Sequence, residues 1–351
     1  MKLEEIEYRK ISEIKKELLY DFYTKAFPLR SEVLFKNWKW ISRYSLSKQE
    51  PLVALYQNKV IAHAGLISTQ IFHKKTTHNA IWFIDFFILP EFRNLGLGKS
   101  LTNKWMELEG NQLTFCNKNS LKIFEKLNWE QDKNFYKSCK IINPLKWIPI
   151  IKTLGQDKLK KLNFFNLFNR STYSKNVSFI NLLDNKNFFL DLEGQKKINK
   201  EETSKPFIIK DKSWAEWRIL ESPFIKYYHL FSIETSYVVV SINFENNKKK
   251  LSIIHSNYED DYYKSVILNS VINWSVDNNI DIIWLSLNQI SNSNKLEKFF
   301  KINFNLIFAC NSLNSSLEKN ELRSIANLEG VDSDLEILNY IKNNLNYFTI
   351  K

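Results

Sequence analysis

The spacing of apolar residues predicts helices and strands in alternation near the start of the chain. Apolar positions recur near helical spacing over residues 12–27, which predicts a helix. Two runs rich in apolar and β-branched residues, 52–56 and 60–68, predict strands. Residues 57–59 between them are typical of a hairpin turn, so we expect the two strands to pair.

The next stretch predicts a buried strand followed by a helix. Residues 80–89 include the run IWFIDFFIL, which is apolar except for Asp85. We expect Pro90 to end this strand, because proline has no N–H to donate to a sheet. Residues 98–109 carry an apolar stripe at helical spacing, and Gly110 is a natural stop for that helix.

The order of the predicted elements indicates the fold class. A short strand over residues 112–116 and a helix over residues 121–127 follow, and Asn128 suits the left-handed conformation that ends many helices. Strands and helices therefore alternate, as expected for an α/β chain of the α+β type with a mixed central sheet flanked by helices.

The chain is long enough for two domains, since it has 351 residues. Residues 144–175 contain two prolines and many lysines, and we interpret them as a linker that is partly helical. The predicted domains are residues 1–143 and residues 176–351, the second of which ends in a helical extension.

Composition and charge narrow the class of protein. Apolar residues make up 44% of the chain, which is enough to build packed cores and excludes a disordered chain. The net charge of +12 favours acidic partners such as phosphorylated cofactors, sugar nucleotides, nucleic acid or anionic membranes. Most of the lysines are expected on a solvated surface, and no nucleic-acid-binding module is recognisable, so a nucleic-acid partner is not expected.

Several expected absences favour a cytoplasmic protein. The N-terminal sequence MKLEEIEYRK is charged, so no signal peptide is expected. No stretch reaches about 18 uninterrupted apolar residues, so no membrane span is expected. The three cysteines lie far apart and predict no disulfide framework, and no cluster has metal-ligand spacing, so no metal is expected.

The stretch LPEFRNLGLGKS, residues 89–100, stands out because glycine is scarce: it holds two of the seven glycines in the chain. It lies where the apolar strand meets a helix, whose first amides lack partners and carry positive potential. Gly96 and Gly98 would let the backbone approach an anion, and Arg93 and Lys99 add charge. The stretch predicts a phosphate-binding turn, although a tight turn alone would also recruit glycine.

Two motifs in this region resemble those of the GNAT acetyltransferase superfamily. The first reads Pro90-Glu91-Phe92-Arg93-x-x-Gly96-x-Gly98 and resembles the acyl-CoA-binding motif Q/R-x-x-G-x-G/A. The second reads Asn117-x-x-Ser120-x-x-x-Phe124, followed by Leu127-Asn128-Trp129, and is similar to the later N-x-x-A-x-x-x-Y motif. The resemblance covers roughly residues 1–140.

The resemblance implies an acyl-CoA-dependent N-acyltransferase with acetyl-CoA as co-substrate and a small-molecule amine as acceptor. Main-chain amides of Asn94, Leu95, Gly96, Leu97, Gly98 and Lys99, beside Arg93, would hold the pyrophosphate of coenzyme A. The main chain near Ile88 would pair with the thioester or the pantetheine arm, and Asn117 would contact that arm. The amine would then attack the thioester directly.

Three further residues bear on catalysis. Asp85 matches an acidic residue that in relatives binds the acceptor amine or serves as general base, although it could instead be structural. Phe124 replaces a tyrosine that in many relatives protonates the leaving thiolate, and phenylalanine has no proton to give. His63 could contact the acceptor, but a satisfied histidine in a strand is the more common role.

The second half resembles a degenerate copy of the first. The run Phe35-x-x-Trp38-Lys39-Trp40 is similar to Trp214-x-x-Trp217-Arg218-Ile219. Asn117, Leu121, Phe124, Leu127, Asn128 and Trp129 have apolar and asparagine counterparts in Asn292, Leu296, Phe299, Ile302, Asn303 and Phe304. We therefore expect two tandem copies, of which the second lacks the glycine turn and carries Asp260 and Asp261 in its place.

The acceptor is expected to be a primary amine, with an amino sugar or a sugar nucleotide as the first candidate. Two alternatives remain from the sequence: a scaffold that keeps the fold without catalysis, which Phe124 favours, and an aminoacyl-tRNA-dependent transferase of the peptidoglycan type. The glycine turn opposes both, because neither needs a coenzyme A site.

Overall fold

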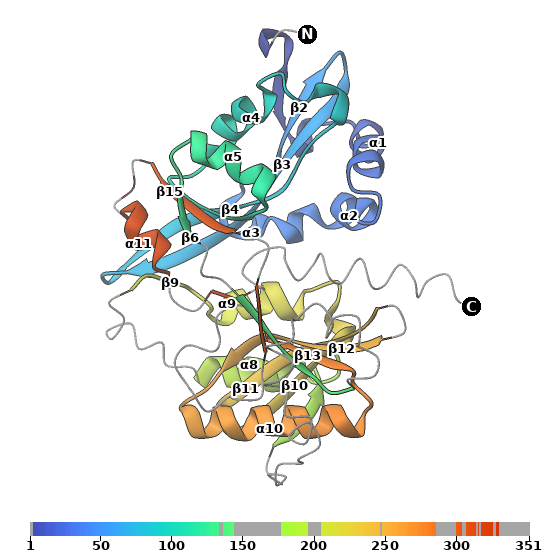
Figure 1. Ribbon diagram of the computed structural model, residues 1–351, viewed down its shortest axis with the longest axis vertical. Coiled ribbons are helices and arrows are strands. Elements are labelled where there is room, and N and C mark those ends of the chain that lie inside the picture. Colours follow the sequence, from blue (N-terminus) through green and yellow to red (C-terminus); the bar gives the residue numbers. More distant parts are fainter. Residues whose placement is uncertain are drawn as a thin grey trace, which may run out of the picture.

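Two mixed β-sheets form the framework of the protein, each covered by helices (Figure 1). The computed structural model describes residues 3–132, 136–143, 177–195, 205–245, 248–285, 300–303, 307–313, 315, 317–325 and 328–329. The predicted α/β class with mixed sheets flanked by helices is confirmed. None of the helices within these residues is long and apolar enough to cross a membrane.

The first sheet is built mainly from the N-terminal part of the chain. In spatial order it contains β1 (Glu7–Lys10), β2 (Leu52–Tyr56), β3 (Lys59–His73), β4 (Thr76–Ile88), β5 (Asn111–Cys116), β15 (Ile307–Ser312) and β6 (Glu130–Asp132), while β9 (Phe207–Ile208) also pairs with β3. All neighbours are antiparallel except β4 and β5. The hairpin of β3 and β4 is longer than the sequence predicts. Its outer end pairs with β9, which comes from a distant part of the same chain.

Helices cover both faces of the first sheet. Alternate residues of β2, β3 and β4 contribute to two separate apolar clusters, as the period of two in a strand requires. One cluster includes residues of α1 (Lys16–Ala26) and α2 (Ser31–Ile41), and the other includes residues of α4 (Leu97–Met106) and α5 (Lys118–Lys126). The short helix α3 (Tyr44–Ser47) follows α2.

The second sheet repeats the order and directions of the first. It contains β8 (Ser178–Asn181), β10 (Tyr228–Ile233), β11 (Ser236–Glu245), β12 (Lys248–Asn257), β13 (Ile282–Leu285), β7 (Tyr136–Ile141) and β14 (Phe300–Asn303). Only the pair β12 and β13 is parallel among the described pairs, as β4 and β5 are in the first sheet. Its helices are α8 (Lys186–Gln195), α9 (Lys212–Ala215), η6 (Glu216–Leu220) and α10 (Asp261–Asp277). The repeated topology is consistent with the predicted tandem arrangement.

The two halves exchange one strand each. β15, from near the C-terminus, lies between β5 and β6 of the first sheet, and β7, from the N-terminal part, lies between β13 and β14 of the second. A division of the chain at residues 143 and 176 therefore does not follow the two sheets. The predicted linker and most of the predicted C-terminal extension lie outside the described residues, apart from the short helix α11 (Lys319–Arg323).

A pair of tryptophans joins the halves where α2 meets η6. The Trp40 Nε1–H donates to the Trp217 carbonyl at 2.7 Å, and the Trp217 Nε1–H donates to the Trp40 carbonyl at 2.7 Å. This reciprocal contact involves two tryptophans of the two sequence runs that the predicted repeat compares. One apolar cluster also includes residues of both halves, such as Trp82 and Tyr237.

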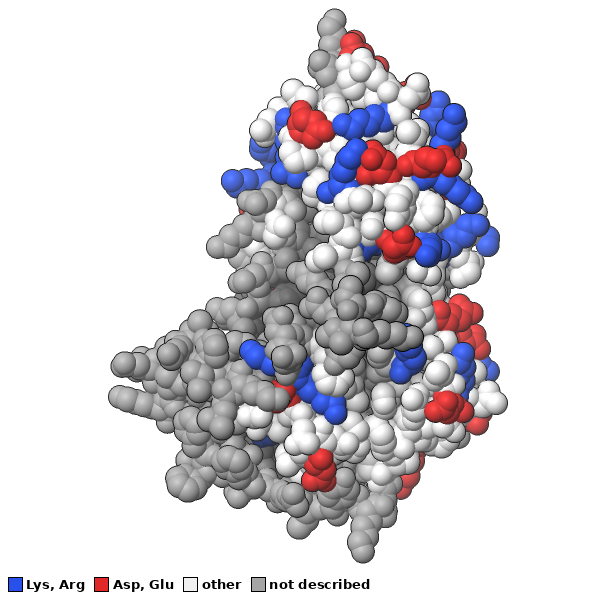
Figure 2. Space-filling view, turned by 90° about the vertical axis from the view of Figure 1, so that its right-hand side faces the viewer, with Lys and Arg blue, Asp and Glu red and all other residues white. Residues whose placement is uncertain are grey.

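The charge of the chain is not gathered into one patch on the face that Figure 2 shows. Lysine and arginine alternate there with aspartate and glutamate over the upper half of the view. This alternation matches the expectation that most lysines lie on a solvated surface.

Candidate functional site

A cleft of about 740 Å³ opens where β4 ends and α4 begins. It lies on the face of the first sheet that α4 and α5 cover, because Phe86 and Ile88 pack on that face. The cleft is lined by residues of β4, the turn, α4 and α5: Phe86, Phe87, Ile88, Arg93, Asn94, Gly96, Gly98, Lys99, Asn117, Ser120, Ile123 and Lys126.

The cleft follows the separation of β4 from β5. The two parallel strands pair only from Ile81 to Phe83 on the β4 side, although β4 continues to Ile88. Beyond Phe83, the edge of β4 is therefore not covered by β5, and its main chain borders the cleft. An uncovered strand edge of this kind can pair with an extended ligand.

Gly96 is the N-cap residue of α4, and its backbone conformation explains why glycine stands at this position. Its φ is +80°, in the left-handed region where side chains are strained. As a glycine it has no side chain with which to cap the first amides of the helix, and the first turn of α4 contains no acidic residue. These amides and the positive end of the helix dipole therefore suit an anion in the cleft.

Glycine at position 98 is explained by the lack of space for a side chain and not by its backbone conformation. A Cβ at this position would lie 3.2 Å from Cδ1 of Ile123, 3.4 Å from Cδ1 of Ile88 and 3.8 Å from Cζ of Phe86. All three neighbours line the cleft. A side chain here would reduce the cleft between β4 and α5.

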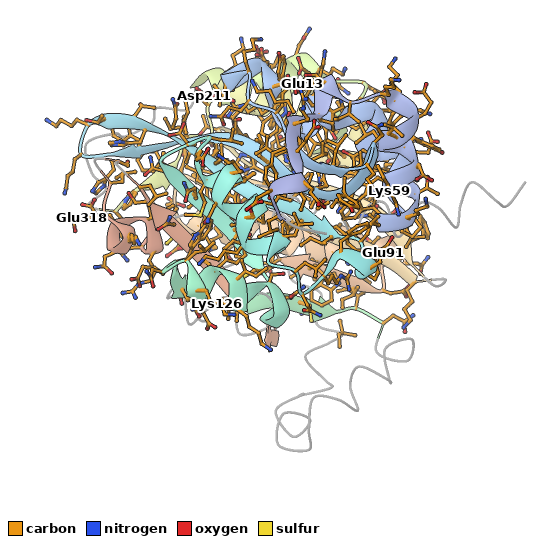
Figure 3. All side chains as sticks on the ribbon, turned by 90° about the horizontal axis from the view of Figure 1, so that it is seen from above. Glu13, Lys59, Glu91, Lys126, Asp211 and Glu318 are labelled. Atoms are coloured by element: carbon orange, nitrogen blue, oxygen red, sulfur yellow. The ribbon has the colours of Figure 1, made fainter. Side chains whose placement is uncertain are left out.

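Three cationic side chains border the cleft. Arg93 is exposed; its Nε–H donates to the Ile88 carbonyl at 2.9 Å and its guanidinium lies 5.2 Å from the Phe87 ring centre. Lys99 lies in the first turn of α4, and Lys126 ends α5 (Figure 3). On the outer side of the turn, Lys59 and Glu91 form an exposed ion pair at 3.0 Å.

Asn117 precedes α5 at the far wall of the cleft. Its Oδ1 accepts hydrogen bonds from the Ser120 N–H at 3.0 Å and from the Ser120 hydroxyl at 3.2 Å, which is the pattern of an N-cap. The side chain that the resemblance assigns to the coenzyme arm therefore also holds the start of the helix.

Most of the predicted cofactor residues come together in the cleft. Those that line it are Ile88, Arg93, Asn94, Gly96, Gly98, Lys99 and Asn117. Leu95 is exposed and Leu97 is buried in the core beneath the turn, and neither is among the residues that line the cleft. Ser120 was noted only as part of the second motif, and Ile123 and Lys126 were missed, although the spacing of three residues on one helix face after Asn117 is a usable signal.

The structure does not place Asp85 with these residues. Its side chain is 3% exposed and forms an ion pair with Arg30, whose Nη2–H donates to Oδ2 at 3.2 Å and whose Nη1–H donates to Oδ1. Asp85 is also the extra residue of a β-bulge, with φ at +48°. This geometry favours the structural reading of Asp85 over the predicted general base.

His63 lies behind the bulge, on the face that α1 covers. Its Nδ1 is 2.9 Å from the main-chain oxygen of Asp85, and its Nε2 is 3.2 Å from the Tyr23 hydroxyl. Burial lowers the pKa of His63, and the hydrogen bond to Asp85 opposes this effect only in part. His63 is a buried strand residue, 2% exposed, and it is not among the described residues that line the cleft.

Phe124 is a core residue. It is 2% exposed, and its ring centre lies 4.5 Å from that of Trp129 and 5.5 Å from that of Phe83. No hydroxyl is therefore present at this position to protonate a leaving group.

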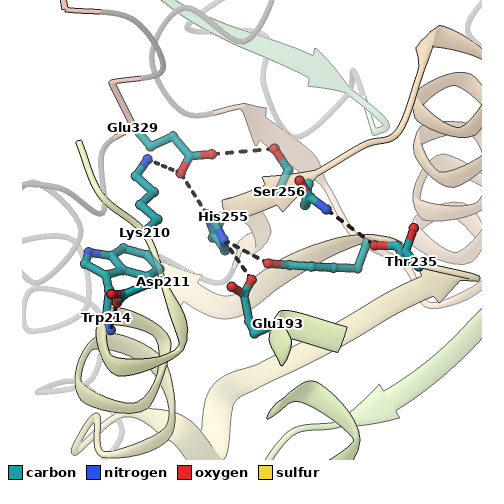
Figure 4. A network of polar contacts seen from close by, with 10 residues as sticks. Glu193, Lys210, Asp211, Trp214, Thr235, His255, Ser256 and Glu329 are labelled. Atoms are coloured by element: carbon teal, nitrogen blue, oxygen red, sulfur yellow. Dashed lines mark hydrogen bonds and ion pairs between the residues drawn. The ribbon is translucent and has the colours of Figure 1, made fainter. Parts of the chain in front are cut away.

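The second sheet has a buried polar cluster beside its own bulge. The Glu329 carboxylate lies 2.6 Å from Lys210 Nζ and 2.8 Å from His255 Nδ1, and His255 Nε2 lies 3.1 Å from the Tyr237 hydroxyl (Figure 4). Burial alone would raise the pKa of Glu329, but Lys210 and His255 outweigh it and hold that pKa well below its usual range. This cluster ties residue 329 to the second sheet.

Comparison with known proteins identifies the region that contains the cleft. Residues 15–129 match the family described as "Acetyltransferase (GNAT) family". This match supports an acyltransferase. No curated protein sequence is significantly similar to the chain.

Solved structures share the fold of most of the chain. A probable N-acyltransferase from Enterococcus faecalis V583 superposes with a TM-score of 0.56 at 12% identity, covering 87% of this chain and 71% of its own. A GCN5-related N-acetyltransferase from Kribbella flavida superposes with a TM-score of 0.56 at 12% identity, and the match covers 88% of this chain and 72% of its own. N-myristoyltransferase from Saccharomyces cerevisiae, with bound myristoyl-CoA, superposes with a TM-score of 0.53 at 10% identity, and the match covers 93% of this chain and 85% of its own. At these identities the likeness concerns the fold alone.

Proposed function

Because residues 15–129 belong to the GNAT acetyltransferase family, we propose that the protein is an acyl-CoA-dependent N-acyltransferase that uses acetyl-CoA. The observation that carries this proposal is the start of α4, whose N-cap residue has no side chain and which opens into a cleft bordered by Arg93, Lys99 and Lys126. The acceptor is a primary amine on a small molecule, with amino sugars and sugar nucleotides as the first candidates.

The turn supplies the site for the diphosphate. Main-chain amides from Asn94 to Lys99 would surround its oxygens, and Asn94 (φ +64°) and Gly96 (φ +80°) give the left-handed conformations that turn successive amides inward. Arg93 and Lys99 would add charge-assisted hydrogen bonds. Lys126 and Asn117 border the opposite wall, beside the rest of the coenzyme.

The uncovered edge of β4 supplies the site for the reacting arm. An extended pantetheine chain placed along residues 84–88 would pair with the main chain as a strand does. This would leave the thioester beside Phe86 and the bulge at Asp85.

The reaction is a direct transfer. The amine nitrogen attacks the thioester carbonyl carbon, the C–N bond forms, and the C–S bond breaks with its electron pair on sulfur. A thiolate with a pKa of about 8.5 leaves readily, so the lack of a donor at Phe124 does not prevent the step. The attacking nitrogen loses one proton, either to solvent or to a basic group on the acceptor molecule.

Two experiments test the proposal. Isothermal titration with coenzyme A should show binding to the wild type, and release of free thiol from acetyl-CoA should be detected with at least one amine of a panel that includes amino sugars and sugar nucleotides. Coenzyme binding without thiol release for any amine would favour the scaffold, and absence of coenzyme binding would contradict the site.

A matched pair of variants tests the turn itself. Gly96→Asp places a carboxylate where the diphosphate would lie, and Gly96→Asn has nearly the same shape without the charge. Both residues tolerate positive φ better than most. We expect Gly96→Asp to weaken coenzyme A binding at least about 100-fold, or about 2.7 kcal/mol, relative to Gly96→Asn.

A further inference from the structure

The bulge in β4 is held from two sides by buried residues that the proposed reaction does not otherwise use. Arg30 binds the Asp85 side chain, and His63 binds the Asp85 main-chain oxygen. Asp85 as a whole is half-buried although its side chain is 3% exposed, so the accessible part of this residue is its main chain. The bulge thus presents backbone, and not a carboxylate, to its surroundings.

The hydrogen bonds fix the tautomer of His63. A main-chain oxygen can only accept, so Nδ1 of His63 must carry the proton that it donates to Asp85. In the neutral imidazole Nε2 is then the acceptor, and the Tyr23 hydroxyl donates to it. Burial, which lowers the pKa of His63, keeps the ring in this neutral form.

The same contact orients the next amide. The carbonyl of Asp85 and the N–H of Phe86 belong to one trans peptide and point in opposite directions. The carbonyl points to His63, on the α1 face of the sheet, so the Phe86 N–H points away from it, toward the face where Phe86 borders the cleft.

Gly65 leaves room for this arrangement. It pairs with Ile84 directly beside the bulge, where a Cβ would be 2.9 Å from the Ile84 main-chain oxygen and 3.2 Å from both Asp85 Cβ and His63 Cε1. Any side chain at position 65 would therefore push against the bulge and against His63.

We propose that His63, supported by Tyr23 and Arg30, is a positioning residue that fixes the Asp85–Phe86 peptide and so directs the Phe86 N–H at the thioester carbonyl. This inference rests on the proposed function. The N–H is then in place to stabilise the negative charge that develops on the carbonyl oxygen when the amine attacks. Loss of one such donor costs about 10²–10³ in rate.

Two polar substitutions separate this role from simple packing. In His63→Asn the side-chain amide occupies the place of Nδ1 and can still donate to Asp85, whereas in His63→Gln it reaches the place of Nε2 and meets Tyr23 instead. The probe is [1-¹³C]acetyl-CoA, whose carbonyl stretch shifts to lower frequency when the oxygen accepts a hydrogen bond. We expect this shift in the wild type and in His63→Asn but not in His63→Gln.

Coenzyme A without the acetyl group serves as the control ligand, because it lacks the carbonyl. Its affinity should change by less than about threefold in both variants, which is about 0.7 kcal/mol. Failure of the wild type to bind acetyl-CoA would overturn the proposed function and this inference together. Binding with an unchanged carbonyl shift in folded His63→Gln would overturn this inference alone.

A measurement on the wild type decides the matter if either variant fails to fold. The chain has five histidines, and ¹⁵N-labelled imidazoles report which ring nitrogen of each carries the proton. We expect His63 to carry it on Nδ1. A proton on Nε2 would mean that His63 does not donate to Asp85 and would overturn the inference.

Discussion

In the first sheet, β4 is followed by Gly96, a residue without a side chain, at the start of α4. In the second sheet, β12 is followed by Asp260, whose carboxylate accepts from the Tyr263 N–H at 2.9 Å and so caps α10. Asp261 adds a second acid to the first turn. The same strand order thus ends in one helix start suited to an anion and in another occupied by the protein's own carboxylate.

The two sheets therefore differ at the turn before the helix and agree in their strand order. Both sheets have the same neighbours and directions, and both have a bulge on the fourth strand of their antiparallel run, at Asp85 and near Ile254. Under the proposed function, a few residues at this turn would decide which of the two sheets carries a site.

The polar clusters at the two bulges differ in where their carboxylate comes from. In the first sheet, Arg30 binds Asp85, a residue of the bulge itself. In the second, Lys210 and His255 bind Glu329, from the C-terminal part of the chain. The first cluster shapes a strand edge beside the cleft, and the second fastens a distant segment.

The largest effect is expected from a substitution in the exchanged strand. Phe308 in β15 is fully buried, 6.0 Å from Trp82 and 5.5 Å from Phe115 between ring centres. Phe308→Ala should lower the free energy of unfolding by about 3–5 kcal/mol, as measured by urea denaturation. In this variant coenzyme binding should also be lost at a lower urea concentration than in the wild type, although residue 308 lies far from the cleft residues in sequence.

A surface phenylalanine is the control. Phe188 on α8 is 40% exposed, so Phe188→Ala should change the stability by less than about 0.5 kcal/mol. If coenzyme binding in Phe308→Ala persisted to the same urea concentration as in the wild type, the first half would be an independent unit and the exchange of strands would not matter energetically.

The exchange also marks how far the sequence could predict the structure. The strands at residues 52–56 and 112–116 follow from local pattern, and Asn128 adopts the expected positive φ. Gly110 was wrong as a helix stop: α4 ends at Met106, and a Cβ at Gly110 would lie 2.7 Å from the main-chain oxygen of Leu313. No local pattern contains a neighbour two hundred residues away.

The site divides in the same way. The position of Gly96 and Gly98 at a strand-to-helix turn was predictable because the turn consists of a few consecutive residues. The partner of Asp85 was not, because the ion pair with Arg30 forms across 55 residues of sequence. A carboxylate in an apolar strand looks the same in sequence whether it faces a substrate or a buried arginine.

The second prediction concerns Glu329. Its pKa is held below the unfolded value of about 4.3, so this contact stabilises the protein above that pH and is lost as the pH falls. Glu329→Gln should cost about 3 kcal/mol at pH 7, because it removes the carboxylate charge closest to the buried Lys210, whereas His255 keeps the Glu193 carboxylate at 3.8 Å. Urea denaturation between pH 3 and 7 should show a weaker loss of stability on acidification in the variant. A parallel loss in both proteins would mean that Glu329 is not the group responsible.

The third prediction asks whether uncapping the second helix restores a site. Asp260→Ala removes the cap of α10 and should lower the free energy of unfolding by about 1 kcal/mol. Coenzyme A should bind to Asp260→Ala with the stoichiometry of the wild type, because Asp261 remains and the turn contains no glycine. A second bound coenzyme would show that the Asp260 cap alone prevents coenzyme binding at the start of α10.

The smallest effect is expected at the edge of the cleft. Lys126 borders it from the end of α5, whereas Lys104 lies on α4 outside the lining and pairs with Glu107 at 3.1 Å. An exposed lysine near a phosphate contributes about 0.5–1 kcal/mol and is screened by salt. Lys126→Ala should therefore weaken coenzyme A binding about two- to fivefold at low ionic strength and less at high ionic strength, while Lys104→Ala should leave it unchanged. Equal effects of both variants would mean that the general field of the +12 chain attracts the coenzyme, and that Lys126 has no particular place in the site.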